Sequence, residues 1–347
     1  MTTDAATSTS TTTAASARRA WWRPVARAVF RRVLGGAVVV AAVVTLTFAL
    51  VHLAPGDPFG SSLENPEVTE AVREAWRRQW GLDRPLPEQY ARYVTSLAHG
   101  DWGYSFSMHE PVRDALARAL PNTLFLMGIA YTLSFAIGVA IGALQAARRG
   151  TLLDRAIGGV ALFFYSVPDF WLALMVMLTL AYWVPLFPTA GMSDPVMSAY
   201  FTPAERVVDL LRHVTLPALT LTLINSGAAA RYQRAALLDA LKSDYVRTAR
   251  AKGLPERRVL LGHALRNSLL PTITLMGLAF PALLAGAVFV EKVFAWPGMG
   301  WVAVNAVNTR DYPLVLASVV VGSALTVAGS ALADASYAAA DPRLRAR

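Results

Sequence analysis

The chain has 347 residues, of which 55% are hydrophobic and only 16% are charged, and its net charge is +9. A soluble domain of this size would carry more charge and fewer long apolar runs, so the composition predicts a polytopic membrane protein. The sequence contains no cysteine, which excludes disulfides, thiolate metal sites and a cysteine nucleophile. Most basic residues lie in short loops beside apolar runs, a pattern typical of topology determinants and not of a nucleic-acid-binding surface.

The N-terminal 32 residues combine a Thr-, Ser- and Ala-rich stretch with six arginines. Their composition predicts a disordered, basic tail over residues 1–32. An uncharged run follows over 33–56, and its length of about 20 residues is enough to cross a bilayer. Because no small-residue cleavage pattern follows the run, we interpret it as a retained first transmembrane helix and not as a signal peptide.

Residues 57–120 are rich in Pro, Trp, Tyr and charge. They are predicted to form an external insert between the first two transmembrane helices. Within this insert, residues 70–80 place apolar side chains on one face of a short amphipathic helix.

Five further apolar segments are each close to the ~20 residues that a transmembrane helix needs. They are residues 121–147, 156–183, 213–236, 267–290 and 313–334. With both termini in the cytoplasm, about two-thirds of the 32 Lys and Arg residues lie inside, as the positive-inside rule requires. The sequence therefore predicts an all-α membrane protein of about six transmembrane helices, with a core over 121–336, a cytoplasmic loop at 239–266 and a cytoplasmic tail at 337–347.

A few polar residues fall inside or beside these apolar segments. Asp169 follows Pro168 in the third segment, near the middle of the membrane, where a carboxylate is costly and normally faces a cavity or a partner. Two interpretations stay open, a residue that lines a translocation path and a structural residue at a proline kink. Glu291 and Lys292 are expected to form a local ion pair, and Trp296 is expected at interfacial depth.

The sequence offers no site for chemistry. A nucleotide-binding loop needs a Lys that follows Gly and precedes Ser or Thr. None of the three lysines, Lys242, Lys252 and Lys292, follows a glycine. The five histidines are scattered, without the spacing of metal ligands. We therefore expect no catalytic residue, no metal site and no cofactor on this chain.

The cytoplasmic loop has the most informative pattern. It reads Asp244-Tyr245-Val246-Arg247-Thr248-Ala249-Arg250-Ala251-Lys252-Gly253. Gly253 is suited to end a helix, and Pro255 with Glu256 is suited to begin the next one, so a helix–turn–helix is predicted. The small residues Ala249, Ala251 and Gly253 would let the pocket of another protein close around the bend. A solvated loop that only fixes topology is the alternative.

This pattern resembles the cytoplasmic loop of importer-type ABC transporter permeases, in the form that the dipeptide, oligopeptide and nickel branch uses. Other segments resemble the same branch in the same order along the chain. They are His52-Leu53-Ala54-Pro55-Gly56-Asp57-Pro58, Gly100-Asp101-Trp102-Gly103, Trp296-Pro297-Gly298-Met299-Gly300 and Arg310-Asp311-Tyr312-Pro313. The long insert before the second helix suits the first of the two permeases of the branch, the B-type subunit.

The resemblance implies a heteromeric importer in the bacterial plasma membrane. A second permease would complete the path, two cytoplasmic ATPases would bind ATP and Mg, and an external solute-binding protein would deliver the substrate. Di- or oligopeptides are the favoured substrates, with nickel complexes, glutathione and sugars left open. The residues implied in ATPase coupling are Asp244, Tyr245, Arg247, Thr248, Ala249, Ala251, Lys252 and Gly253.

Two other functions remain as alternatives. A secondary transporter or channel acting without an ATPase needs an ion-coupling site, usually built from several intramembrane charges. Asp169 is thin support for such a site, and the pattern of the cytoplasmic loop would stay unexplained. An intramembrane enzyme lacks any catalytic pair in this sequence.

Overall fold

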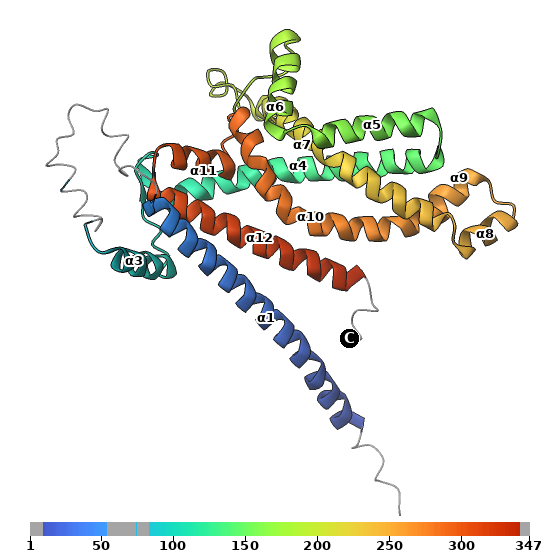
Figure 1. Ribbon diagram of the computed structural model, residues 1–347, viewed down its shortest axis with the longest axis horizontal. Helices are drawn as coiled ribbons and strands as arrows, with labels where there is room; N and C mark the ends of the chain where they lie inside the picture. Colours follow the sequence, from blue (N-terminus) through green and yellow to red (C-terminus); the bar gives the residue numbers. More distant parts are fainter. Residues whose placement is uncertain (1–9, 54–73, 75–82, 341–347) are drawn as a thin grey trace, which may run out of the picture.

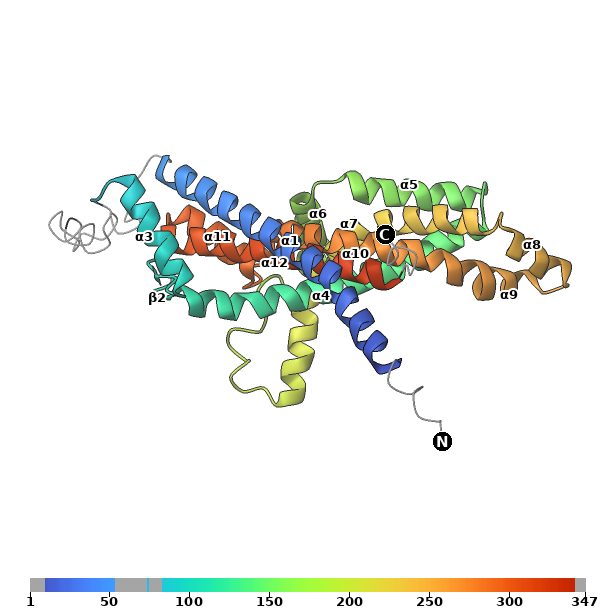
Figure 2. The ribbon, with the colours of Figure 1, turned by 90° about the horizontal axis from the view of Figure 1, so that it is seen from below.

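The computed structural model describes residues 10–53, 74 and 83–340, with backbone alone for 10–30, 275–287 and 332–340. The described part is helical except for one two-stranded hairpin (Figure 1). The segments α8 (Asp244–Ala251) and α9 (Glu256–Arg258) lie at one end of the elongated bundle, and α3 (Leu86–Ala98) with the hairpin lies at the other (Figures 1 and 2). The predicted all-α membrane fold is confirmed.

The first helix, α1, runs over Ser10–Leu53 and so begins well before the predicted start at residue 33. The prediction of a disordered tail is wrong for residues 10–32. Ala and Arg are strong helix formers, so the helix continues beyond the apolar stretch into its basic flank. The part of α1 that is suited to cross a membrane is Arg31–Leu53, and α1 packs against α12 (Tyr312–Ala340). A Cβ on Gly36 would lie 2.4 Å from Cγ1 of Val327, which shows how closely the two helices approach.

The external insert is described only in part, and the amphipathic helix predicted over 70–80 lies outside the described residues except at position 74. The described part contains α3 (Leu86–Ala98) and an antiparallel hairpin of β1 (Tyr104–Ser105) and β2 (Glu110–Pro111). Helix α4 (Val112–Ala147) then begins at Val112 and not at 121. Its first turns alternate charged residues with Val112, Ala115 and Leu116, which are buried against α11 (Met299–Asn308) and α12. Because these turns carry charged residues, the sequence predicted them as part of the insert and not of the helix.

The third predicted helix is in fact two. Helix α5 (Leu152–Ser166) is followed by α6 (Asp169–Met177) and the π-helical turn η2 (Leu178–Trp183), and the chain bends by 105° between them. Pro168 removes a backbone donor and disfavours helical geometry at the preceding residue, so the helix ends there. This pair is either a broken crossing or a re-entrant segment.

The bounds of the remaining helices agree more closely with the predicted ranges. Helix α7 (Pro203–Ala240) begins ten residues before the predicted position 213, behind a capping box of Thr202 and Glu205. After α7, the chain forms α8 (Asp244–Ala251), α9 (Glu256–Arg258), η3 (Val259–Leu265), α10 (Arg266–Val293), α11 (Met299–Asn308) and α12 (Tyr312–Ala340). Because α12 is helical to Ala340, the predicted tail starting at 337 begins too early.

Among the described residues, four helices are long and apolar enough to cross a membrane, and the bent α5–α6 pair makes a fifth. Helix α10 has 28 residues, about 42 Å of helix, and occupies the predicted crossing at 267–290. The prediction of about six crossings is compatible with this arrangement if α10 is included.

Helix α7 is the centre of the bundle and packs most extensively against α4. Two glycines of α4 permit this contact. A Cβ on Gly138 would lie 2.4 Å from Cβ of Ala229, and one on Gly142 would lie 2.4 Å from the Ala230 carbonyl oxygen. This pair of small residues therefore serves helix packing within the chain.

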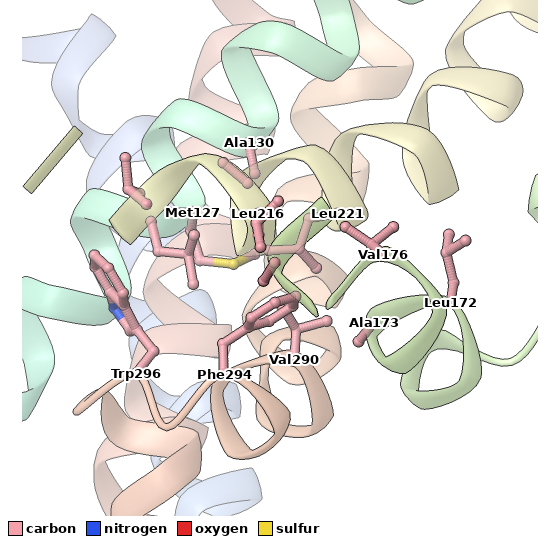
Figure 3. Packing of buried hydrophobic residues seen from close by; sticks show 14 residues of the cluster. Met127, Ala130, Leu172, Ala173, Val176, Leu216, Leu221, Val290, Phe294 and Trp296 are labelled. Carbon is pink, nitrogen blue, oxygen red and sulfur yellow. The ribbon is translucent and has the colours of Figure 1, made fainter. Parts of the chain in front are cut away.

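The buried apolar residues form three clusters along the bundle. The first joins α4, α6, α7 and α10 with the turn that holds Phe294 and Trp296 (Figure 3). The second joins the start of α4 with α11 and α12. The third joins the end of α4 with α7, α8 and η3. Helix α4 contributes to all three.

Candidate functional site

The bend after α8 is a helix end of defined geometry. The Gly253 amide donates to the Arg250 carbonyl at 2.9 Å, and the Leu254 amide donates to the Ala249 carbonyl at 3.4 Å. These two bonds form a Schellman motif, which requires a left-handed residue after the helix. Gly253 has a φ of +74°, so its predicted role as helix terminator is confirmed. The second helix starts behind Pro255 and continues through η3 into α10.

Two residues of α8 face the interior of the chain. Val246 and Ala249 are buried in the third cluster, with Ala146 of α4, Leu237 of α7 and Val259 of η3. Ala249 was predicted to lie on a surface that a partner would close around. That assignment is wrong for its side chain, because its small size is used in packing α8 onto the bundle.

The other predicted coupling residues are exposed. They are Asp244, Tyr245, Arg247, Thr248, Ala251, Lys252 and Gly253. Positions three and four apart share one face of a helix, so Asp244, Thr248 and Ala251 form one ridge. A Cβ on Gly253 would meet no atom of the described part of the chain within 4 Å. The structure therefore brings these residues together on a free surface at the tip of the bundle.

An ion pair crosses the bend and holds its two arms together. Arg250 donates from Nε and Nη2 to the two carboxylate oxygens of Glu256, at 3.1 and 2.6 Å. These bonds hold the pKa of Glu256 below its ordinary value. Both side chains are exposed, so the pair adds little to stability, but its two-point geometry restricts the angle of the turn.

The base of this segment is attached to the bundle by a buried carboxylate that the sequence analysis did not single out. Asp154 of α5 accepts two bonds from Arg234 of α7, at 3.0 and 2.8 Å, and one from the Gly150 amide at 3.0 Å. Gln145 of α4 donates to the Asp154 carbonyl at 3.2 Å. The group joins three helices within two turns of the end of α7. In the prediction of topology, Arg234 was only one of the basic residues on the cytoplasmic side.

Asp169 and Pro168 lie away from this tip, at the corner between α5 and α6. Pro168 precedes the first turn of α6, and Asp169 is the first residue of that helix. Asp169 is therefore not in the middle of a continuous helix, as the sequence predicted. A carboxylate at a helix N-terminus is stabilised by the helix dipole, which reduces the cost of its partial burial. This position of Asp169 fits both open interpretations. Among the described residues, no hydrogen bond or ion pair joins Asp169 to residues 244–253.

The predicted ion pair between Glu291 and Lys292 is wrong, and Glu291 instead has a structural role. Its carboxylate is fully buried and accepts from Thr123 Oγ1 at 2.7 Å and from the Gly300 amide at 2.7 Å. Lys292 is exposed, and no ion pair joins the two residues. A Cβ on Gly298 would lie 2.5 Å from Glu291 Oε2, so glycine is needed there for the carboxylate to fit.

Trp296 is also placed differently from the prediction of an interfacial residue. Its side chain is fully buried in the first cluster (Figure 3), and Nε1 donates to the Asn122 carbonyl at 3.0 Å. Asn122 in turn donates to the Pro297 carbonyl at 2.8 Å. The turn between α10 and α11 is thereby fixed to α4.

A third buried carboxylate fixes the hairpin of β1 and β2. Asp311 precedes α12 and accepts from Ser105 Oγ at 2.6 Å, from Ser107 Oγ at 2.8 Å and from the Ser107 amide at 2.9 Å. It also caps α12 by accepting from the Leu314 amide at 3.3 Å. Two sequence segments, 100–107 and 310–313, are therefore parts of one contact.

Comparison with known proteins shows the family to which the chain belongs. Residues 138–346 match the family described as binding-protein-dependent transport system inner membrane component. Residues 25–127 match the N-terminal model of the same membrane components. The chain belongs to this family. It is a multi-pass permease of an ABC transporter in the bacterial inner membrane, which favours this function over the alternative of a transporter or channel that acts without an ATPase.

Individual relatives match over nearly the whole chain. A putative peptide permease of Brucella suis is 38% identical over 322 residues, which cover 92% of this chain and 99% of the relative. The oligopeptide transport system permease AppB of Bacillus subtilis is 36% identical, with 92% of this chain and 99% of the relative covered. The dipeptide permease DppB of Escherichia coli is 35% identical, over 86% and 93%. Among solved structures, the methionine ABC transporter MetNI covers 65% of this chain and 98% of its own, with TM-score 0.48 and 19% identity.

Proposed function

We propose that this chain is the B-type permease of an importer for short peptides. The support for a peptide substrate is that relatives named as peptide, oligopeptide and dipeptide permeases align with almost all of the chain. In this proposal the chain pairs with a second, different permease, receives substrate from an external binding protein, and is driven by two ATPases that carry ATP and Mg.

The observation that carries the proposal is the exposed bend after α8. It combines a free ridge, a glycine with open space around it and a buried inner face that is attached to the bundle. We propose that an ATPase binds this tip through Asp244, Tyr245, Arg247, Thr248, Ala251, Lys252 and Gly253. Ala249 then contributes from inside, by packing α8 against α4 and α7.

The transmission of movement follows from the same contacts. A displacement of α8 is passed to α7 and α4 through Val246 and Ala249, since close-packed interiors transmit displacement. The Asp154–Arg234 ion pair joins α5 to the same end of α7. The bent α5–α6 pair would follow α7, and Pro168 and Asp169 at its corner would change their exposure to the path.

The proposed orientation places α8 and both termini in the cytoplasm. The charge distribution of the sequence supports it. The position of α3 and the hairpin at the opposite end from α8 and α9 is compatible with an external insert (Figure 1).

The function is tested by reconstituting this chain in proteoliposomes with its second permease, the two ATPases and the binding protein. We expect ATP-dependent uptake of a labelled dipeptide, and no uptake of a labelled sugar or nickel complex. The matched control carries a hydrolysis-deficient ATPase and should take up nothing. Uptake of the sugar or the nickel complex in place of the peptide would contradict the substrate assignment and leave the permease role intact.

A further inference from the structure

A cation on α7 is held against an aromatic ring of α5. The guanidinium carbon of Arg231 lies 4.4 Å from the ring centroid of Tyr165. Both side chains are exposed, and no acidic group pairs with Arg231 in the part of the chain that the structure describes. Arg234, one turn further along α7, differs because Asp154 binds it at two points. Arg231 thus keeps its hydrogen-bond donors available for a ligand.

The register of the two helices shows where this charge points. Asp154 pairs with Arg234, and a Cβ on Gly227 would lie 2.8 Å from the Ala161 carbonyl oxygen, so α5 and α7 are antiparallel. Arg231 is four residues from Gly227 toward the α8 end. Tyr165 is four residues from Ala161 in the other direction. Their Cα atoms are therefore about 12 Å apart along the helix axes.

The contact is made because each side chain leans toward the N-terminus of its own helix. For α7 this direction leads away from the α8 end and toward the middle of the bundle. A long basic side chain near the end of a membrane helix usually turns the other way, so that its charge reaches the nearer aqueous surface. Arg231 instead carries its charge toward the corner of Pro168 and Asp169, which begins three residues after Tyr165.

An exposed guanidinium at this depth would be costly against lipid, so its surroundings are expected to be a water-filled path. The cation–π contact with the Tyr165 ring positions the guanidinium without using its N–H donors. The edge of a guanidinium matches the two oxygens of a carboxylate. A free peptide of any side-chain composition carries such a group at its C-terminus.

We propose that Arg231, positioned by Tyr165, binds the C-terminal carboxylate of the peptide during its passage through the membrane. The inference rests on the proposed function of peptide import. It also gives a reason why substrates of varied side chains could use one path, because the carboxylate is common to all of them.

The first test measures uptake by the complete reconstituted importer at saturating concentrations of loaded binding protein. Arg231→Gln should lower the maximal rate of dipeptide uptake about tenfold, the scale of losing a charge-assisted contact in the path. Arg231→Lys should lose less, because the charge remains. The matched control is Arg212→Gln, an exposed arginine on the same helix, which should keep the wild-type rate. An unchanged rate in Arg231→Gln overturns the inference, and so does loss of complex assembly, which would show an interface role.

The second test measures binding of the peptide without transport. It uses a single introduced cysteine, because the chain has no cysteine of its own. Ser166→Cys places one exposed thiol beside Tyr165. A free dipeptide added from the α8 side should slow its reaction with a thiol reagent, whereas the same dipeptide with a C-terminal amide should not. Adding Arg231→Gln should abolish the protection. Equal protection by both peptides, or protection that persists without Arg231, overturns the carboxylate site alone. A wild-type importer that takes up no peptide overturns the proposed function as well.

Discussion

At the scale of single residues, Gly253 connects backbone geometry to coupling. Its positive φ is costly for most side chains, by about 1 kcal/mol, and the space around it is open. The two requirements, conformation and small volume, can be separated by substitution. Asn adopts the left-handed region more easily than other residues, whereas Ala adds little volume.

We expect Gly253→Leu to abolish uptake and to release the ATPases, because a large side chain would fill the surface on which a partner closes. The protein should still insert in the membrane, since a Cβ at this position would meet no atom of the described residues within 4 Å. Gly253→Ala measures the cost of a positive φ with little added volume. Gly253→Asn measures the effect of added volume with a smaller cost of the positive φ. Uptake and copurified ATPase are measured for each. Full uptake with normal ATPase content in Gly253→Leu would refute the coupling role.

The two alanines of α8 offer a matched pair. Ala249 is buried in the third cluster and Ala251 is exposed. Ala249→Leu should lower thermal stability, because overpacking a core costs typically 1–3 kcal/mol. Ala251→Leu should leave stability unchanged but weaken ATPase binding. Thermal unfolding of the purified chain and ATPase pull-down check the two outcomes. Equal stability of both variants would contradict the packing of α8 described above.

The residue scale also shows what the sequence could reveal. The left-handed conformation at Gly253 was predictable, because a glycine at a helix end, two residues before a proline, commonly terminates the helix in this conformation. The burial of Ala249 was not, since it depends on which face of α8 meets α4 and α7. Glu291 and Asp311 were unpredictable for a related reason. Their hydrogen-bond donors lie more than 160 residues away in the sequence or come from turns whose geometry is set by the fold.

At the scale of elements, apolar length located the helices but did not set their ends. Helices α4 and α7 extend beyond their apolar cores because their charged turns are amphipathic or capped. The corner at Pro168 was predicted only as a kink. A proline shows that a helix is interrupted, but the 105° direction of the next segment depends on tertiary packing of Leu172, Ala173 and Val176.

The corner provides the test of the predicted path. If Asp169 lines the path, Asp169→Asn should lower peptide uptake while assembly and ATP hydrolysis stay normal. If the carboxylate instead stabilises the start of α6 through the helix dipole, the variant should assemble poorly. Asp114→Asn, at an exposed position in the first turn of α4, serves as the control. Wild-type uptake together with normal assembly would reject both interpretations of Asp169.

At the scale of the whole molecule, the proposed orientation places the opposite ends of the bundle on opposite sides of the membrane. Glu88 of α3 and Arg257 of α9 are exposed at these two ends. In the cysteine-free chain, Glu88→Cys should react with an impermeant thiol reagent added to intact cells from outside. Arg257→Cys should react only after the membrane is opened. The reverse labelling would contradict the proposed orientation and remove the cytoplasmic site for the ATPases.

Helix α4 has a consequence for how the two ends communicate. It places Val112 in the second cluster, Leu126 in the first and Ala146 in the third, so one continuous helix of 36 residues is part of every core. Such a helix is about 54 Å long and connects the three cores through one element. If the proposed ATPase binds at α8 and tilts α4, the movement would reach the first turn of α4, which contacts β2. The hairpin that Asp311 fixes would then change position when ATP binds.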